Sequence, residues 1–194
     1  MKSTNPIMLY GPWTQGYALD RHITTSTYLG EDEYGHDKFD NIRSELGELV
    51  YQLKYKKQNT VDDIMQFVIP FISKQWNDHN INLIIPAPPS NERQVQPVFE
   101  ICKAIGSKLN IYVDLEVLRK TNSQQLKGLD SKKKQSTINN SIILNRNIIQ
   151  PVNILIVDDL YQSGATLTAA TNILKNVPFV MNIYVLTMTK TRNS

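Results

Sequence analysis

The fold class of this sequence is decided by the stretch Ile154-Leu155-Ile156-Val157-Asp158-Asp159-Leu160-Tyr161-Gln162-Ser163-Gly164-Ala165-Thr166-Leu167. Residues 153–157 form a near-continuous apolar run, which is typical of a buried parallel strand. Two carboxylates follow the run, and a short polar loop then leads into a helix predicted over 165–175. Because ligands of open α/β sheets bind beyond the carboxyl ends of the strands, this junction predicts a binding site.

The loop before this predicted helix has the chemistry of an anion site. Free N–H groups at a helix N-terminus attract phosphate, Gly164 lets the backbone curl around it, and Ser163 and Thr166 add hydroxyl donors. Asp158 and Asp159 would repel that anion unless a neutral group lies between them. A ribose diol meets this requirement, because its hydroxyls donate to the carboxylates while its 5-phosphate occupies the loop. The alternative is a capping role, in which Asp159 or Ser163 only starts the helix.

The chain around this junction alternates predicted strands and helices. Strands are predicted over 83–85, 111–113, 115–118, 142–144 and 183–188. A first helix is predicted from the apolar stripe Ile42, Leu46, Leu49, Val50 and Leu53. A second helix is predicted to begin at a capping box formed by Thr60 and Asp63, and Pro70 is expected to bend or end it. A third predicted helix has an apolar face formed by Val95, Val98, Phe99, Cys102, Ile105 and Leu109. This order predicts an α/β fold, a mostly parallel sheet with helices on both faces.

The N-terminal part of the chain has a different pattern. A short apolar run at 7–10 is followed by the turn signal Gly11-Pro12. Residues 16–29 are rich in aromatic and β-branched side chains, which predicts antiparallel strands in a hairpin over Trp13 to Leu29. We therefore expect a small β-rich segment over 1–40 and one compact domain over 41–194.

Composition excludes several classes of protein. The chain has 194 residues, of which 41% are hydrophobic, and this is enough to bury a core. Cys102 is the single cysteine, so an intramolecular disulfide and an all-cysteine zinc site are both excluded. No apolar run reaches the ~18 residues of a membrane helix, and the first residues lack the apolar core of a secretory signal. We expect a cytoplasmic protein with no membrane partner.

The net charge of +3 does not select a partner by itself. Basic residues are dense only at 54–57 and 132–134, whereas nucleic-acid binders usually concentrate their charge on one stripe. An anionic small molecule would account for these lysines equally well. Nucleic acid is therefore not the expected partner.

The segment from Val157-Asp158-Asp159 to Gly164-Ala165-Thr166 resembles the phosphoribosyl pyrophosphate signature of type I phosphoribosyltransferases. Gln162 and Ser163 stand where that family commonly has two threonines. The resemblance implies transfer of ribose 5-phosphate from phosphoribosyl pyrophosphate to a nitrogen nucleophile, with Mg2+ bridging pyrophosphate and ribose hydroxyls. It implies no direct protein ligand to Mg2+, which Asp158 and Asp159 would hold through water. It places the substrate on Tyr161, Gln162, Ser163, Gly164, Ala165 and Thr166.

The resemblance assigns two further segments to the part of the site that would bind pyrophosphate. The run Ala87-Pro88-Pro89-Ser90 is similar to a proline-rich loop of the ComF (competence protein F) branch, which implies that these residues contact the substrate and that Arg93 holds pyrophosphate oxygens. The polar segment 119–140 lies where the family has a mobile lid, with Lys120 closing over pyrophosphate. The alternatives are a rigid turn with a solvated Arg93 and a disordered polar insertion. The resemblance gives the catalytic residues as Asp158, Asp159, Lys120 and Arg93.

The rest of the ComF likeness concerns the N-terminal half. The segment ending in Leu53-Lys54-Tyr55 resembles a ComF segment, and Lys54 either approaches ligand phosphates or only caps its helix. The zinc-binding cysteine cluster of many ComF relatives is absent, and segment 1–40 stands in its place as a hood that would select the acceptor. The partners implied are phosphoribosyl pyrophosphate, an unidentified acceptor and a second copy in a homodimer. A non-catalytic sensor of the same ligand and a competence or DNA-uptake accessory protein remain as alternatives.

Overall fold

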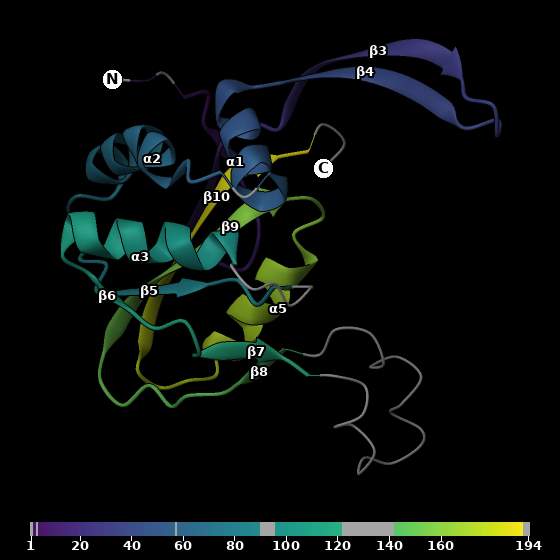
Figure 1. Ribbon diagram of the computed structural model, residues 1–194. Helices are drawn as coiled ribbons and strands as arrows, with labels where there is room; N and C mark the ends of the chain where they lie inside the picture. The colour runs from purple at the N-terminus through teal and green to yellow at the C-terminus, as the bar shows by residue number, and fades with distance from the viewer. Residues whose placement is uncertain (1, 3, 57, 90–95, 122–141, 192–194) are drawn as a thin grey trace, which may run out of the picture.

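A six-stranded sheet forms the centre of the molecule in the computed structural model, which describes residues 2, 4–56, 58–89, 96–121 and 142–191 (Figure 1). Its strands follow the order β1 (Ile7–Met8), β2 (Gln15–Arg21), β10 (Val180–Lys190), β9 (Val152–Tyr161), β5 (Leu83–Pro86) and β6 (Tyr112–Val113). Neighbouring strands are parallel, apart from the antiparallel pair β1 and β2. The predicted α/β class with a mostly parallel sheet is confirmed.

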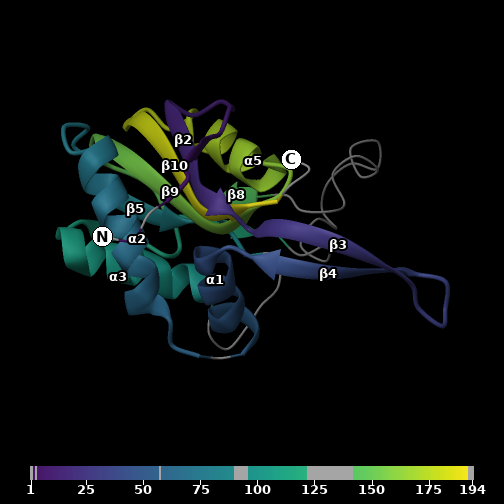
Figure 2. The ribbon, with the colours of Figure 1, turned by 90° about the horizontal axis from the view of Figure 1, so that it is seen from above.

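Helices cover both faces of this sheet, as predicted. On one face lie α1 (Glu45–Tyr55), α2 (Val61–Gln75) and α3 (Pro97–Leu109), and on the other lies α5 (Ala165–Leu174), beside a small ribbon of β7 (Leu118–Lys120) and β8 (Ile142–Leu144) (Figures 1 and 2). The side chains of β9 contribute to two hydrophobic cores, one on each face of the sheet, because successive side chains of a strand point to opposite faces. Leu155 and Val157 pack with α1, α2 and α3, whereas Ile154 and Ile156 pack with α5.

The N-terminal strands differ from the prediction. β2 lies inside the sheet, parallel to β10, so the hairpin predicted over Trp13 to Leu29 is wrong. The physical reason is that Ala18 and Leu19 are both fully buried, one in each core, which requires a strand covered on both faces. The expected β-rich segment over 1–40 therefore contributes β1 and β2 to the central sheet.

The antiparallel ribbon begins after β2. It pairs β3 (Ile23–Glu31) with β4 (Asp37–Arg43) and extends from the body of the molecule (Figures 1 and 2). Ile42, which the apolar stripe assigned to the first helix, lies in β4 and is exposed. The helix α1 begins only at Glu45, because the Ser44 side chain accepts a hydrogen bond from the Gly47 N–H at 2.9 Å and caps it.

The start of α2 also differs from the prediction. The Thr60 hydroxyl donates to the Leu49 carbonyl oxygen at 2.8 Å and makes no capping hydrogen bond, so the predicted capping box is wrong. Thr60 thereby ties α2 to α1. Pro70 does not end the helix, which continues to Gln75.

The second half of the chain follows the predicted order more closely. The strand predicted over 83–85 is β5, the one over 142–144 is β8, and the helices predicted around Val98 and over 165–175 are α3 and α5. Residues 115–117 form a turn, and β7 begins at Leu118. Most of the predicted lid lies outside the described residues, and its first residues, Arg119 and Lys120, belong to β7. No helix in the described part of the chain is long and apolar enough to cross a bilayer.

Candidate functional site

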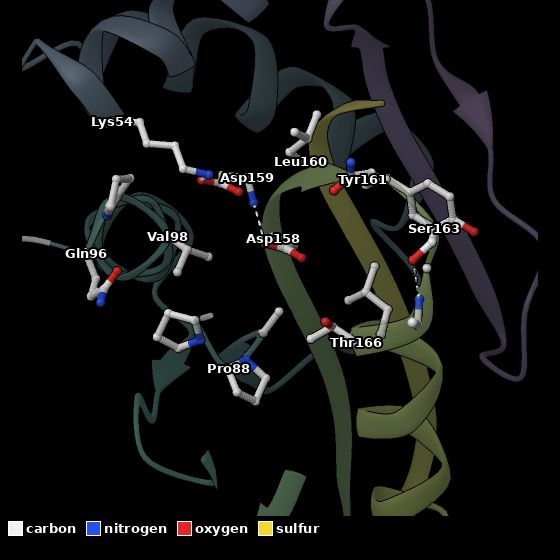
Figure 3. A pocket seen from close by; sticks show the side chains of 17 residues that line it. Lys54, Pro88, Gln96, Val98, Asp158, Asp159, Leu160, Tyr161, Ser163 and Thr166 are labelled. Atoms are coloured by element: carbon white, nitrogen blue, oxygen red, sulfur yellow. Dashed lines mark hydrogen bonds and ion pairs between the residues drawn. The ribbon is translucent and has the colours of Figure 1, made fainter. Parts of the chain in front are cut away.

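A cavity of about 230 Å³ opens at the carboxyl ends of β9 and β5 (Figure 3). It lies between the first turn of α5, the N-terminus of α3 and the last turns of α1, so four separate parts of the chain meet around it. The lining residues are Lys54, Ala87, Pro88, Pro89, Gln96, Pro97, Val98, Asp158, Asp159, Leu160, Tyr161, Gln162, Ser163, Gly164, Ala165, Thr166 and Leu167. The junction that the sequence marks as a binding site therefore borders a real cavity.

The two carboxylates lie within the extended end of β9, which pairs with β10 as far as Tyr161. Consecutive strand residues point to opposite faces, so Asp158 and Asp159 diverge. The Asp158 carboxylate turns back to accept a hydrogen bond from the Asp159 N–H at 2.8 Å (Figure 3). The Asp159 carboxylate lies on the side of α1, where Lys54 Nζ is 2.7 Å from its Oδ2.

The ion pair between Lys54 and Asp159 is largely shielded from water. The side-chain exposure is 23% for Lys54 and 14% for Asp159. An ion pair with this little solvent around it is screened less than a surface pair. Lys54 thus supplies a positive charge directly beside the two acids that line the cavity.

Burial raises the pKa of Asp158 to about 7, and the neighbouring charge of Asp159 acts in the same direction. The hydrogen bond from the Asp159 N–H and the charges of Lys54 and Lys120 oppose this rise in pKa but do not cancel it. Near neutral pH, Asp158 is therefore divided between its protonated and ionised forms. A hydroxyl donor or a cation bound in the cavity would favour the ionised form.

The turn between β9 and α5 depends on Gly164. Its φ of +74° is a left-handed conformation that side chains with a Cβ rarely adopt. A Cβ at Gly164 would also lie 2.4 Å from the Tyr161 hydroxyl oxygen, so the tyrosine ring packs directly against this turn. The Ser163 hydroxyl accepts a hydrogen bond from the Ala165 N–H at 3.4 Å. The left-handed turn at Gly164 leads directly into the first turn of α5, whose residues Ala165, Thr166 and Leu167 line the cavity.

The segment after β5 forms the opposite wall. The Ala87 N–H donates to the Val157 carbonyl oxygen at 2.8 Å, which fixes this segment to β9. Pro88 and Pro89 line the cavity but have no N–H to donate. Residues 87–89 therefore shape this wall of the cavity but have no free backbone N–H group to donate to a ligand. Ser90 and Arg93, the predicted polar contacts, lie outside the described residues.

Lys120 lies at the end of β7 and is not among the lining residues. Burial lowers its pKa, and the charge of Asp158 opposes that change, so the two groups are electrostatically coupled. The predicted contact of Lys120 with pyrophosphate stays a prediction.

The predicted site residues that the structure describes lie around one cavity, apart from Lys120. These are Asp158 and Asp159, the loop residues 161–166, and Ala87, Pro88 and Pro89. The prediction missed Gln96, Pro97, Val98, Leu160 and Leu167, which also line the cavity. Only Pro97 carried a sequence signal, since proline favours the first turn of a helix and such an N-terminus faces ligands in α/β folds. No residue of the described part of segment 1–40 is in the lining, so its role as a hood stays a prediction.

The side chains of this cavity could contribute to holding a divalent cation but could not hold it without a ligand. Among the described residues, no group of three or more His, Cys, Asp and Glu side chains is arranged to hold a metal ion. Two adjacent carboxylates are oxygen ligands of the kind that Mg2+ prefers, and Mg2+ usually keeps several waters and completes its shell with phosphate oxygens. Asp158 and Asp159 therefore suit a cation that arrives with a phosphorylated ligand, and do not form a site for a cation alone.

Comparison with known proteins relates this fold to type I phosphoribosyltransferases. No protein-family model and no curated protein matches the sequence. The adenine phosphoribosyltransferase of Trypanosoma brucei, solved with AMP, pyrophosphate and ribose-5-phosphate, matches with a TM-score of 0.53 at 10% identity, over 98% of this chain and 87% of that chain. The adenine phosphoribosyltransferase of Saccharomyces cerevisiae, solved with an imino-altritol bisphosphate and adenine, matches with a TM-score of 0.50 at 11% identity, over 85% and 84%. At these identities the similarity concerns the fold, and this chain has the type I phosphoribosyltransferase fold.

Proposed function

We propose that this protein binds phosphoribosyl pyrophosphate and transfers ribose 5-phosphate to a nitrogen nucleophile, releasing pyrophosphate. One observation carries the proposal: a single cavity of about 230 Å³ joins the carboxylate pair of β9 to the Gly164 turn at the N-terminus of α5. A ligand that has both a diol and a phosphate group satisfies both walls at once. The fold shared with adenine phosphoribosyltransferases supports the same ligand class.

The proposed ligand occupies the cavity in a defined direction. Its 5-phosphate lies on the amides of the first turn of α5, with hydroxyls from Ser163 and Thr166. Its ribose hydroxyls donate to Asp158 and Asp159, and its pyrophosphate points toward Pro88 and Pro89. Since these prolines lack N–H groups, the donors to pyrophosphate come from side chains, for which Arg93 and Lys120 are the proposed residues.

The reaction breaks the bond between the anomeric carbon and the pyrophosphate oxygen and forms a bond from that carbon to the nucleophile's nitrogen. Pyrophosphate leaves with the bonding electron pair, and the nitrogen loses a proton. Positive charge develops on the ribose ring, close to the two carboxylates, which stabilise it electrostatically. Mg2+, held by the ligand and through water by Asp158 and Asp159, would neutralise the departing pyrophosphate. The protein's own contribution is mainly positioning.

Several finer assignments belong to this proposal. The segments Pro88-Pro89 and Leu53-Lys54-Tyr55 support a place in the ComF-like branch, without that branch's N-terminal zinc cysteines. Lys54 lines the cavity, which supports a role at the ligand beyond capping its helix. We further propose a cytoplasmic homodimer in which segment 1–40 influences the choice of acceptor.

The proposal is tested by measuring pyrophosphate release from phosphoribosyl pyrophosphate and Mg2+ with panels of purine, pyrimidine and amine acceptors. The wild-type protein should release pyrophosphate with at least one class of acceptor, and Asp158→Asn with Asp159→Asn should not. Asp62→Asn is the matched control, since Asp62 is exposed on α2, outside the cavity lining. Ligand binding without release for every acceptor would indicate a sensor. Neither binding nor release would contradict the proposal and leave the accessory role.

A further inference from the structure

His22 is the single residue between β2 and β3, where the chain leaves the central sheet and enters the antiparallel ribbon (Figure 2). Its main chain is hydrogen-bonded to two other elements. The His22 N–H donates to the Lys190 carbonyl oxygen of β10 at 2.8 Å, and the His22 carbonyl oxygen accepts from the Ser44 N–H at 3.3 Å, at the start of α1. These two bonds fix the place of His22 between the carboxyl end of the sheet and the N-terminus of α1.

The helix α1 also contacts His22 through Gly47. A Cβ at Gly47 would lie 2.5 Å from the His22 carbonyl oxygen, so the first turn of α1 rests directly on this residue. The last turn of the same helix carries Lys54. His22 is therefore fixed relative to the helix that supplies the cation of the cavity.

The imidazole of His22 points to the strands that carry the other member of the ion pair. Its Nδ1 lies 3.1 Å from Thr189 Oγ1, and this buried hydroxyl is 3.4 Å from the Asp159 carbonyl oxygen. A carbonyl oxygen only accepts hydrogen bonds, so the Thr189 hydroxyl donates to it and accepts from the Nδ1–H of His22. Buried hydroxyls in proteins are almost always satisfied by such partners. Thr189 thus links the ring of His22 to the main chain of Asp159.

The charges around His22 agree with this arrangement. Burial lowers the pKa of His22, and the charges of Arg43 and Lys54 act in the same direction, whereas the charge of Asp159 opposes them. The ring is therefore neutral near neutral pH and carries one proton. That proton is the one that Nδ1 donates to the Thr189 hydroxyl.

We propose that His22 is a positioning residue for the ion pair between Lys54 and Asp159. Its main chain rests against α1, which carries Lys54, and its side chain holds the main chain of Asp159 through Thr189. His22 does not line the cavity, so it acts through this pair and not by contact with a ligand. The consequence for ligand binding rests on the proposed function, in which the ion pair borders the ribose and phosphates of phosphoribosyl pyrophosphate.

The first test needs no ligand and measures the coupling between Lys54 and Asp159. Urea unfolding of Lys54→Met, Asp159→Asn and the protein with both changes gives this coupling as a double-mutant cycle. The coupling should be present in the wild-type background and largely lost in His22→Leu, which has no donor to Thr189. His22→Asn, which offers an amide N–H close to the position of the ring Nδ1–H, should retain the coupling.

The matched control for this cycle is His36→Leu, at an exposed histidine in the connection between β3 and β4. It should leave the coupling as in the wild type. Thr189→Val, which removes the hydroxyl and keeps the shape of the side chain, should lower the coupling as His22→Leu does, and it replaces that variant if the latter does not fold. Equal coupling in the His22→Leu and His36→Leu backgrounds, or no coupling in the wild type, would overturn the proposal.

The second test is the dissociation constant of phosphoribosyl pyrophosphate with Mg2+, measured by calorimetry. His22→Leu should raise it about fivefold in the wild-type background and less than about twofold in the Lys54→Met background, because the pair through which His22 acts is then absent. An equal factor in both backgrounds would overturn the positioning role. A wild type that does not bind this ligand would contradict the proposed function alone, and the coupling of Lys54 with Asp159 would still decide the role of His22.

Discussion

Lys54 Nζ lies 2.7 Å from Asp159 Oδ2, which joins the last turn of α1 to the end of β9 across the mouth of the cavity. The contact leaves the carboxylate pair with one partnered member and one whose pKa is raised to about 7. The two adjacent aspartates are therefore not equivalent. Asp159 has a cation beside it, whereas Asp158 is the group that changes its protonation near neutral pH.

Loss of the Lys54 charge should weaken the binding of phosphoribosyl pyrophosphate. Lys54→Met leaves two acids in the cavity without their closest cation, and the ligand is polyanionic. We expect its dissociation constant to rise about tenfold, comparable to the loss of one charge-assisted contact. Titration calorimetry with Mg2+ present measures this, with Lys74→Met, an exposed lysine of α2, as the control. Equal affinities for wild type and Lys54→Met would show that Lys54 has only a structural role.

Asp158 should make the folded state less stable as pH rises. Its pKa is about 7 in the folded protein against an ordinary value of 3.8, so between these pH values the folded state holds a proton that the unfolded state has released. The free energy of unfolding therefore falls through this window and levels off above it. Asp158→Asn should remove this loss, about 2 to 3 kcal/mol, when urea unfolding is compared at about pH 5 and about pH 8. Parallel pH profiles for the two proteins would contradict the raised pKa.

Binding of the ligand should release a proton below neutral pH. If ribose hydroxyls donate to Asp158, binding selects its ionised form, and the protonated fraction must lose its proton first. Calorimetry at about pH 6.5 in buffers of different ionisation enthalpy counts this proton, because the observed heat then changes with the buffer. The count should fall toward zero in Asp158→Asn. A buffer-independent heat for the wild type would argue that Asp158 does not face the ligand.

Substitution of Gly164 should remove binding at a modest cost in stability. An alanine there must adopt a left-handed φ of +74°, and its Cβ would lie 2.4 Å from the Tyr161 hydroxyl oxygen. We expect the free energy of unfolding to fall by about 1 to 3 kcal/mol and the phosphate turn to lose its shape. Gly30→Ala is a matched control, since Gly30 has a φ of +100° with nothing within 4 Å of the added Cβ. If Gly164→Ala binds the ligand as well as Gly30→Ala does, the turn is not the phosphate site.

The cap of α1 should affect stability more than binding. Ser44→Ala removes the oxygen that accepts from the Gly47 N–H and should lower the free energy of unfolding by about 1 kcal/mol. Ser44→Thr, which keeps the hydroxyl, should retain most of that stability in the same urea unfolding experiment. Because Lys54 lies at the opposite end of α1, the affinity for phosphoribosyl pyrophosphate should change little. A loss of affinity as large as that of Lys54→Met would mean that the cap positions Lys54.

The parts of the fold that were predictable from sequence are those in which neighbouring residues carry the signal. The apolar run ending at Val157, the two carboxylates and Gly164 are contiguous, so the strand, the turn and the helix could be read together. β2 could not be placed in this way, because its partner β10 lies at the other end of the chain. Ile42 matched the spacing of the helical stripe by coincidence. Nothing in the neighbouring sequence indicates that it lies in β4 with its side chain exposed.

The site was predictable where it is formed by the segments after β9 and β5, but not where the helices α1 and α3 complete it. The β9 side is a continuous segment, whereas the Lys54 side depends on how α1 packs on the sheet. Gln96 and Val98 reach the cavity because α3 begins there, which a spacing of apolar residues does not reveal. The raised pKa of Asp158 likewise follows from burial, a property of the folded protein rather than of the acid pair in sequence.

The most direct test of the central claim is calorimetry with phosphoribosyl pyrophosphate and Mg2+ on the wild type and on Asp158→Asn with Asp159→Asn. If the cavity of β9 and α5 holds this ligand, the wild type binds it in a saturable, one-to-one manner and the double variant, folded by circular dichroism, does not. Absence of binding to the wild type, or equal binding to both proteins, would contradict the account.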